Sequence, residues 1–586
     1  MSETQQSKKP GNVVQLVPQA GSRAAGQGKE TGGRNAEQAR NGTGQKPPQN
    51  LGRGHDGAPP HEDHDDPGTP SDSPFGVEPY RQTDVGNAAR LIHRFGKDIR
   101  WCAVMPHGGV LVWDGNRWTS DSKSTITAYT HAVARDLVDE VAAMRAELAR
   151  LQAMAAGSIP TPPALALTLK SAIGGLEARV KTAAKWAEQS EMSARLKAMA
   201  EQALHQVAIN FDDLDADPML LNTARGLVDL RVGELRKPAR EDLITKITGS
   251  QASHTAKCPT WIAFLTKIMG GDTDPVGAAE MVGFLQRVLG YCLTGDVTEQ
   301  CMFILFGQGS NGKSVLLDVI REVWGEYAMH ARAQTFMQSQ QTGGIPNDVA
   351  AFRGARLITS SEPKQGEPLD ESLIKEMTGD AALTARFMRA EFFTFEPTFK
   401  VFLATNHLPK INGTDHGIWR RIRLIPFTVT IGDDEKDPNL KQKLLAERDG
   451  ILRWAVQGCG EWLHGDARTG AGPGLRPPDR VVQATKQYRN DMDVLADFLA
   501  ERCLLGEGRS TPNGDLYNAF KNWCIENGVN GGRPKSHRWL TLQMKAKKFQ
   551  TDGRKDRAPR WEGIEVIERE PPPFSSGYGR GARGEA

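Results

Sequence analysis

The spacing of apolar residues in the first half of the chain changes between helical and strand-like periods. Apolar residues three to four apart predict helices, whereas alternating apolar and polar residues bounded by turn residues predict short strands. Both patterns occur between residues 85 and 246, which predicts a mixed α+β region. The expected elements are a helix at 88–95, strands at 101–105 and 109–113, a hairpin turn at Asp114-Gly115, helices across 125–206 with a break at 157–163, and short strands within 219–246.

Three apolar runs in the middle of the chain predict buried strands of an α/β sheet. They cover residues 302–306, 355–362 and 399–404, and each is followed by polar residues. The first run leads through a glycine-rich segment into an apolar-periodic stretch at 315–323, which predicts strand, loop and helix in succession.

The last part of the chain has the pattern of a small DNA-binding module. Helices are expected at 496–503, 515–527 and 539–549 and a strand at 563–567, an order that suits a winged helix. Residues 533–560 carry ten basic and two acidic residues between aromatic ones, which favours contacts with DNA phosphates. The alternative is a solvated basic face. The DNA-contact candidates in this module are Arg538, Lys545 and Lys548.

Composition changes the picture mainly at the two ends. Residues 1–80 are rich in Gly and Pro and hold two aromatic residues, Phe75 and Tyr80, so we expect them to be disordered, as we do for residues 571–586. No run of 18 apolar residues occurs, and the seven cysteines form no two-residue-spaced pair. We therefore expect a soluble intracellular protein without a membrane partner. The net charge of +2 indicates no partner by itself.

The glycine-rich segment after the first buried strand predicts a phosphate-binding loop. Its glycines let the backbone N–H groups and the helix N-terminus point at phosphates, Lys313 reaches the β- and γ-oxygens, and the Ser314 hydroxyl ligates Mg²⁺. ATP and Mg²⁺ are therefore the expected cofactors. The loop comprises Gly307, Gln308, Gly309, Ser310, Asn311, Gly312, Lys313 and Ser314.

Polar residues at the ends of the other two buried strands complete this prediction. Glu362 fits the position that polarises the attacking water or holds Mg²⁺, and Asn406 fits a position that senses the γ-phosphate. Arg420 and Arg421 follow and would supply an arginine finger to the ATP of a neighbouring subunit. The alternatives are a surface glutamate at a strand end and a surface basic cluster.

As a set, these motifs resemble the superfamily 3 helicases, and more closely the phage and plasmid primase-helicase family that also includes poxvirus relatives. The motifs are GQGSNGKS, FRGARLITSSEP, LIKEMTGDAALTAR, FKVFLATNHLP and DHGIWRRIRLIPF, with WDGNRW, LNTARGLVDLRVGEL and CPTWIAFL upstream and LYNAFKNWC downstream. The resemblance covers roughly residues 85–570.

The resemblance implies a hexameric ring of AAA+-like modules that hydrolyses ATP between subunits and moves 3′ to 5′ on single-stranded DNA at replication forks. It also implies a hairpin that enters the central channel, with strands at 383–387 and 391–395 here. Its DNA-contact candidates are Arg389 at the tip and, with structural ion pairing as the alternative, Lys375, Arg386 and Lys400.

The domain organisation predicted from these features has six parts. They are a tail at 1–80, a pre-helicase α+β domain at 81–255, the ATPase domain at 256–432, a helical segment and linker at 433–480, the winged-helix-like domain at 481–570 and a tail at 571–586.

The leading hypothesis is an ATP-dependent DNA helicase of phage, prophage or plasmid replication, with a primase or an initiation protein as partner. One alternative is a DNA primase or primase-helicase component, for which Asp213 and Asp215 would be the metal-binding acids, although a surface turn at 212–218 explains them as well. The other is an initiator that binds DNA and is switched by ATP.

Overall fold

The computed structural model describes residues 14–15, 80–105, 107–158, 163–338, 347–379, 382–386, 392–411, 416–552 and 558–567. Contacts divide the chain into two compact units. One contains Met1–Val17, Trp113–Thr119 and Asn210–Ala586, and the other contains Pro18–Val112 and Ser120–Ile209. The units therefore divide after residue 209, whereas the sequence analysis placed a domain boundary at 255.

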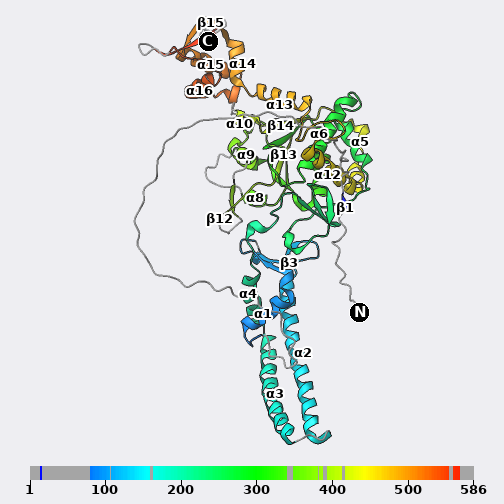
Figure 1. Ribbon diagram of the computed structural model, residues 1–586. Helices are drawn as coiled ribbons and strands as arrows, with labels where there is room; N and C mark the ends of the chain where they lie inside the picture. The colour runs from blue at the N-terminus through cyan, green and yellow to red at the C-terminus, as the bar shows by residue number, and fades with distance from the viewer. Residues whose placement is uncertain are drawn as a thin grey trace, which may run out of the picture. The chain divides into compact units, whose positions relative to one another are not determined.

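The unit around residues 80–209 is dominated by two long helices that lie side by side (Figure 1). Leu137 and Val141 on one of them are buried with Ala183 and Trp186 on the other, as the predicted packed helices require. The elements are α1 Asp84–Phe95, β2 Ile99–Trp101, β3 Val110–Trp113, α2 Thr125–Ala153, α3 Pro163–Ser190 and α4 Ser193–Leu204.

A five-stranded parallel sheet forms the centre of the other unit and confirms the predicted α/β fold. Its strands lie in the order β14-β8-β13-β10-β9. The bounds are β8 Met302–Phe306, β9 Ala328–Arg332, β10 Leu357–Ser361, β13 Lys400–Thr405 and β14 Ile422–Pro426.

Both faces of this sheet are buried. Successive side chains of a strand point to opposite faces, and the two sets enter two different hydrophobic clusters. In β8, Phe303 and Leu305 join one hydrophobic cluster, whereas Met302 and Ile304 join the other. The first cluster includes side chains of α5 Pro259–Ile268, α6 Pro275–Tyr291, α7 Lys313–Trp324, α11 Leu440–Ala446 and α12 Arg448–His464; the second includes those of α8 Asn347–Ala350, α9 Glu371–Met377, α10 His416–Trp419 and α13 Asp479–Asp491.

A smaller sheet precedes the parallel sheet along the chain. The predicted short strands within 219–246 form an antiparallel sheet of β5 Leu220–Thr223, β6 Gly226–Asp229 and β7 Glu234–Arg236. β1, at Val14–Gln15, pairs with β7, so two residues of the tail expected to be disordered form a strand at an open sheet edge. The other calls on residues 1–79 and 571–586 lie outside the described residues.

The predicted hairpin is present as β11 Leu383–Arg386 and β12 Phe392–Phe395, which pair antiparallel. Residues 387–391 lie outside the described part of the chain, and Arg389 is among them. The last part of the predicted helical segment and linker at 433–480 packs on the protein. Leu475 is buried, and its carbonyl accepts a hydrogen bond from Arg287 of α6.

The C-terminal helices and strands lie close together (Figure 1), and their apolar side chains form one buried cluster. Three helices have the predicted order, and a long strand that the sequence analysis missed pairs with the predicted one. The elements are α14 Val494–Arg502, β15 Cys503–Pro512, α15 Asn513–Glu526, α16 His537–Ala546 and β16 Arg560–Val566. Among the described residues, no helix is long and apolar enough to span a membrane.

Candidate nucleotide site

The loop between β8 and α7 curls tightly because two of its glycines have no room for a side chain. A Cβ on Gly307 would lie 2.3 Å from the Phe427 carbonyl oxygen. Gly312 has a φ of +81°, and a Cβ there would lie 2.7 Å from Ile268 of α5. The N-terminus of α7, which begins at Lys313, therefore opens towards the end of β8, where its unpaired N–H groups favour an anion.

The Lys313 ammonium is held by three oxygen atoms. It donates to the Gly307 carbonyl at 2.7 Å, to Asn311 Oδ1 at 3.0 Å and to Asn406 Oδ1 at 3.0 Å. Its side chain is buried. Burial lowers the pKa of Lys313, and the nearby Glu362 carboxylate opposes that shift. Contacts within the chain thus fix the lysine at the mouth of the loop.

Asn406 connects this lysine to the predicted acid. Its amide nitrogen donates to Glu362 Oε1 at 3.1 Å, while its oxygen accepts from Lys313. Glu362 follows β10 directly and has a φ of +49°, a conformation that is uncommon outside glycine and typical of functional sites. The parallel strands β8, β10 and β13 therefore bring together at their carboxyl ends the three residues that the sequence predicted to act together.

These residues surround a cavity of about 360 Å³. Of the predicted loop, Gly309 to Ser314 line it, while Gly307 and Gln308 are not among the lining residues. Ser361, Ala404 and Thr405 also line it, although the sequence analysis gave them no role. Their position next to Glu362 and Asn406 at strand ends is the signal that would have found them.

The cavity has the donor set that Mg²⁺ and a triphosphate need. The Ser314 hydroxyl and the Glu362 carboxylate both line it and are exposed, and hard oxygen ligands of this kind suit Mg²⁺. The Asn311 amide nitrogen is buried without a hydrogen-bond partner, so a donor is left over beside the loop. The residues present therefore fit the predicted cofactor, and Lys313 at the start of α7 lines the same cavity.

The two predicted finger arginines differ in their surroundings. Arg421 is half-buried, and its guanidinium donates to Thr378 Oγ1 at 3.1 Å and to the Gly417 carbonyl at 2.7 Å. Arg420 is exposed. Neither of them lines the cavity described above. Arg421 thus stabilises the turn between α10 and β14, and Arg420 is the one that faces solvent.

The predicted DNA contacts of the ATPase region also differ in how far their side chains are exposed. Lys400 is 2% exposed and donates to the carbonyls of Thr294 at 2.5 Å and Asp296 at 3.1 Å, with the Tyr291 ring 4.5 Å away. This buried position corrects the expectation that Lys400 contacts DNA. Lys375 is half-buried on α9, and Arg386 is exposed on β11.

Asp213 and Asp215 serve the turn that contains them. Asp213 accepts from the Asn210 N–H at 3.0 Å, and Asp215 accepts from the Thr245 N–H at 2.8 Å and its hydroxyl at 2.5 Å. No group of three or more potential metal ligands occurs among the described residues. This geometry favours the surface-turn interpretation over a metal-binding acid pair.

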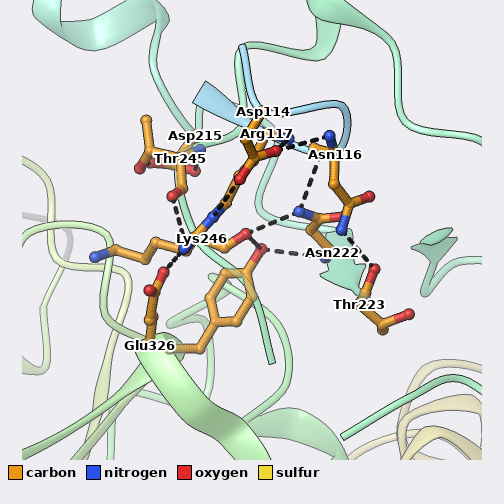
Figure 2. A network of polar contacts seen from close by, with 10 residues as sticks. Asp114, Asn116, Arg117, Asp215, Asn222, Thr223, Thr245, Lys246 and Glu326 are labelled. Carbon is orange, nitrogen blue, oxygen red and sulfur yellow. Dashed lines mark hydrogen bonds and ion pairs between the residues drawn. The ribbon is translucent and has the colours of Figure 1, made fainter. Parts of the chain in front are cut away.

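A polar network joins this turn to the helix of the phosphate loop (Figure 2). The Arg117 guanidinium donates to the Thr245 carbonyl at 3.1 Å and forms an ion pair with Glu326, which lies just after α7. Buried Asn222 donates to the carbonyls of Asn116 and Lys246, and its N–H donates to the Tyr327 hydroxyl. Segments that are far from α7 along the chain thus support its C-terminal end.

In the C-terminal module, Arg538 and Lys545 lie on the exposed face of α16, and Lys548 follows the helix and is also exposed. Leu540 and Met544 on the opposite face are buried in the apolar cluster. The alternation shows that α16 is amphipathic and presents its basic side chains to solvent.

Three parts of the chain match known protein families. Residues 88–270 match the family described as D5 N terminal like, residues 305–421 match a family of unknown function (DUF5906), and residues 490–552 match the family described as Poxvirus D5 protein-like. These ranges contain the pre-helicase region, the phosphate loop with Glu362 and Asn406, and most of the C-terminal module.

The similar proteins are viral. The chain is 29% identical over 339 residues to a "Putative helicase" of Acanthamoeba polyphaga mimivirus, covering 54% of this chain and 34% of that protein. It is 26% identical to a "Putative helicase" of Frog virus 3, with coverage of 48% and 30%, and 31% identical to a "Putative primase" of African swine fever virus, with coverage of 39% and 25%. The chain thus spans about a third or less of the length of these relatives.

Among solved structures, the chain is similar to one titled "The A form apo structure of NrS-1 C terminal region-CTR". The sequences are 14% identical, the alignment covers 51% of this chain and 65% of that one, and the TM-score is 0.32.

Proposed function

The chain belongs to the primase-helicase family that includes the poxvirus D5-like proteins, and from this membership we propose that it is an ATP-dependent DNA helicase. It acts in the replication of phage, prophage or plasmid DNA, as a ring, most simply a hexamer, of AAA+-type P-loop subunits. The observation that carries the proposal is the contact of Lys313 with Asn406, and of Asn406 with Glu362, at the mouth of the cavity.

Each residue of this set has a defined part in ATP hydrolysis. Lys313 binds the β- and γ-oxygens, and Ser314 and Glu362 hold Mg²⁺, which when bound neutralises charge on the phosphates. Glu362 also orients the attacking water, and Asn406 holds Glu362 in position while it faces the γ-phosphate. Because phosphoryl transfer depends on positioning and charge rather than on covalent chemistry, a pre-arranged set of this kind supports the reaction.

The DNA-binding part of the proposal rests on two surfaces. The exposed basic side chains of α16 and Lys548 contact the phosphates of fork DNA through the module that we interpret as a winged helix. The β11–β12 hairpin, with Arg386 on it and Arg389 beyond β11, contacts the single strand in the channel. Lys375 stays a candidate for a weaker contact.

A role in primer synthesis is the second candidate, because one set of relatives carries the printed name "Putative primase". The turn positions of Asp213 and Asp215 do not favour it. Template-directed synthesis by the chain alone would establish it. A DNA-binding initiator switched by ATP would instead hydrolyse ATP and bind DNA without separating strands.

The first test is to compare the wild type with Lys313→Ala. We expect single-stranded DNA to stimulate ATP hydrolysis by the wild type and a 3′-tailed duplex to be unwound. Loss of the Lys313 ammonium should lower kcat by about 10²-fold or more and abolish unwinding, since it removes charge stabilisation of the transition state. Both activities are measured on the same preparations.

Lys486→Ala is the matched control, because Lys486 is exposed on α13 and distant in sequence from the loop. It should retain both activities. Hydrolysis without strand displacement by the wild type would contradict the motor assignment, and unchanged hydrolysis in Lys313→Ala would contradict the assignment of the site.

A further inference from the structure

The β11–β12 hairpin has one anchored face. Leu383 and Ala385 of β11 and Phe395 of β12 are buried in the apolar cluster beneath the sheet, and Phe393 packs against it. The Phe393 ring also meets the Phe211 ring edge-on at 5.4 Å, and the Arg353 guanidinium lies 3.5 Å from the Phe211 centroid. These contacts fix the base of the hairpin on the body of the protein.

The other face of the hairpin is exposed and carries an aromatic ring. Because strand residues alternate, Thr384 and Arg386 of β11 and Phe392 and Thr394 of β12 point away from the cluster. Phe392 is 57% exposed. Among the described residues it is the only exposed phenylalanine, tyrosine or tryptophan. An exposed aromatic ring offers a flat face on which a nucleic-acid base can stack.

A cation lies directly beside this ring. Arg386 and Phe392 are opposite each other in the strand register, and the Arg386 guanidinium lies 5.1 Å from the Phe392 centroid. This cation–π contact holds the guanidinium at the ring without burying either group. The exposed face thus combines a flat apolar surface with a positive charge that is available to an anion.

That combination suits an unpaired nucleotide. A base stacks on an aromatic ring whatever its sequence, and a neighbouring basic group binds the phosphate of the same strand. A double-stranded segment would not fit in this way, because its bases are already stacked on each other.

We propose that Phe392 is a stacking platform for one base of single-stranded DNA and that Arg386 binds the adjacent phosphate. The proposal rests on the proposed function, since it assigns the DNA contact of that helicase. It adds to the hairpin a base-dependent contact, which a purely phosphate-binding hairpin lacks. The expected preference is for unpaired DNA with bases over the same backbone without them.

The test measures binding of two oligonucleotides of equal length by the full chain, one of deoxythymidine and one with abasic sites throughout. Phe392→Ala should lose roughly 5- to 150-fold in affinity for the deoxythymidine strand and change little for the abasic strand. Phe392→Trp should keep the affinity and Phe392→Leu should be intermediate. Arg386→Gln should weaken binding of both strands, since it removes a phosphate contact.

A strand that contains 5-iododeoxyuridine gives a second measurement. Irradiation should cross-link it to Phe392, as mapped by mass spectrometry of the digested protein. Val276→Ala is the matched control, because Val276 on α6 is 73% exposed and is likewise truncated to a methyl group. Its binding should equal that of the wild type.

The outcomes separate this proposal from the one it rests on. If the wild type binds neither strand, the proposed function fails. If the wild type binds both strands equally, or if Phe392→Ala weakens both to the same degree, the stacking site is wrong while the helicase proposal stands.

Discussion

Two lysines of the ATPase region, Lys313 at the start of α7 and Lys400 at the start of β13, lie in different surroundings. The Lys313 ammonium meets Gly307, Asn311 and Asn406 at the mouth of a cavity. The Lys400 ammonium meets two carbonyls in the interior, where burial lowers its pKa to about 8. The first therefore lines a cavity, whereas the second stabilises the fold.

We expect Lys400→Met to lower the free energy of unfolding by about 1–3 kcal/mol, because two buried carbonyls lose their donor. Below about pH 8, Lys400 is protonated in the folded and the unfolded chain. Between about pH 8 and 10.5 only the unfolded chain binds this proton, so the wild type should gain stability relative to the variant as the pH rises through that window. Urea unfolding at several pH values measures this difference.

Lys486→Met, on the exposed side of α13, is the control for that series and should follow the wild type at every pH. A stability difference for Lys400→Met that stays constant from pH 7 to about pH 10.5 would show that the lysine is not buried as described.

At the scale of elements, α7 is held at both ends by residues far away in sequence. Its N-terminus lies against α5 through Gly312 and Ile268. Its C-terminal end is followed by Glu326 and Tyr327, which contact the 114–117 turn and the β5 strand (Figure 2). The position of the phosphate loop therefore depends on segments that contribute nothing to the chemistry.

Asn222→Ala tests this support. The variant removes the donor of the Asn116 carbonyl and the shorter of two hydrogen bonds to the Lys246 carbonyl, so the free energy of unfolding should fall by about 1–3 kcal/mol. Thermal unfolding followed by circular dichroism measures the loss, and ATP hydrolysis should cease at a correspondingly lower temperature. Asn490→Ala, at an exposed position of α13, should leave both midpoints in place. Equal midpoints for the two variants would contradict the supporting role.

At the scale of the whole molecule, the proposed ring explains why an exposed arginine follows the Asn406 strand. Arg421 is occupied by Thr378 and Gly417 of its own chain, and Arg420 faces solvent. An arginine that acts on the ATP of a neighbouring subunit must be exposed in the isolated subunit. We therefore assign the finger to Arg420 and a structural role to Arg421.

Mixing two inactive variants tests this assignment. Lys313→Ala lacks the phosphate lysine and Arg420→Ala lacks the finger, so each alone should hydrolyse ATP at most weakly. In mixed rings, an intact loop of an Arg420→Ala subunit can face an intact finger of a Lys313→Ala subunit, and part of the activity should return. Sizing by light scattering confirms that both variants assemble. A mixture that assembles and stays inactive would refute action between subunits.

The sequence by itself determined the local succession of strand, phosphate loop and helix, because glycine spacing and apolar runs act over a few residues. It also placed Glu362 and Asn406 at the carboxyl ends of strands, which is where parallel sheets bind their ligands. Packed helices at 125–206 followed from their period in the same way.

Only the tertiary structure decided which charged residues are accessible. The burial of Lys400, the half-buried position of Arg421 and the exposed position of Arg420 each depend on neighbours that are distant along the chain, and so does the exposure of the uncharged Phe392. The pairing of β1 with β7 and the strand β15 also depend on a partner strand. Local pattern cannot supply these, because burial and strand pairing are properties of contacts between segments rather than of the segments themselves.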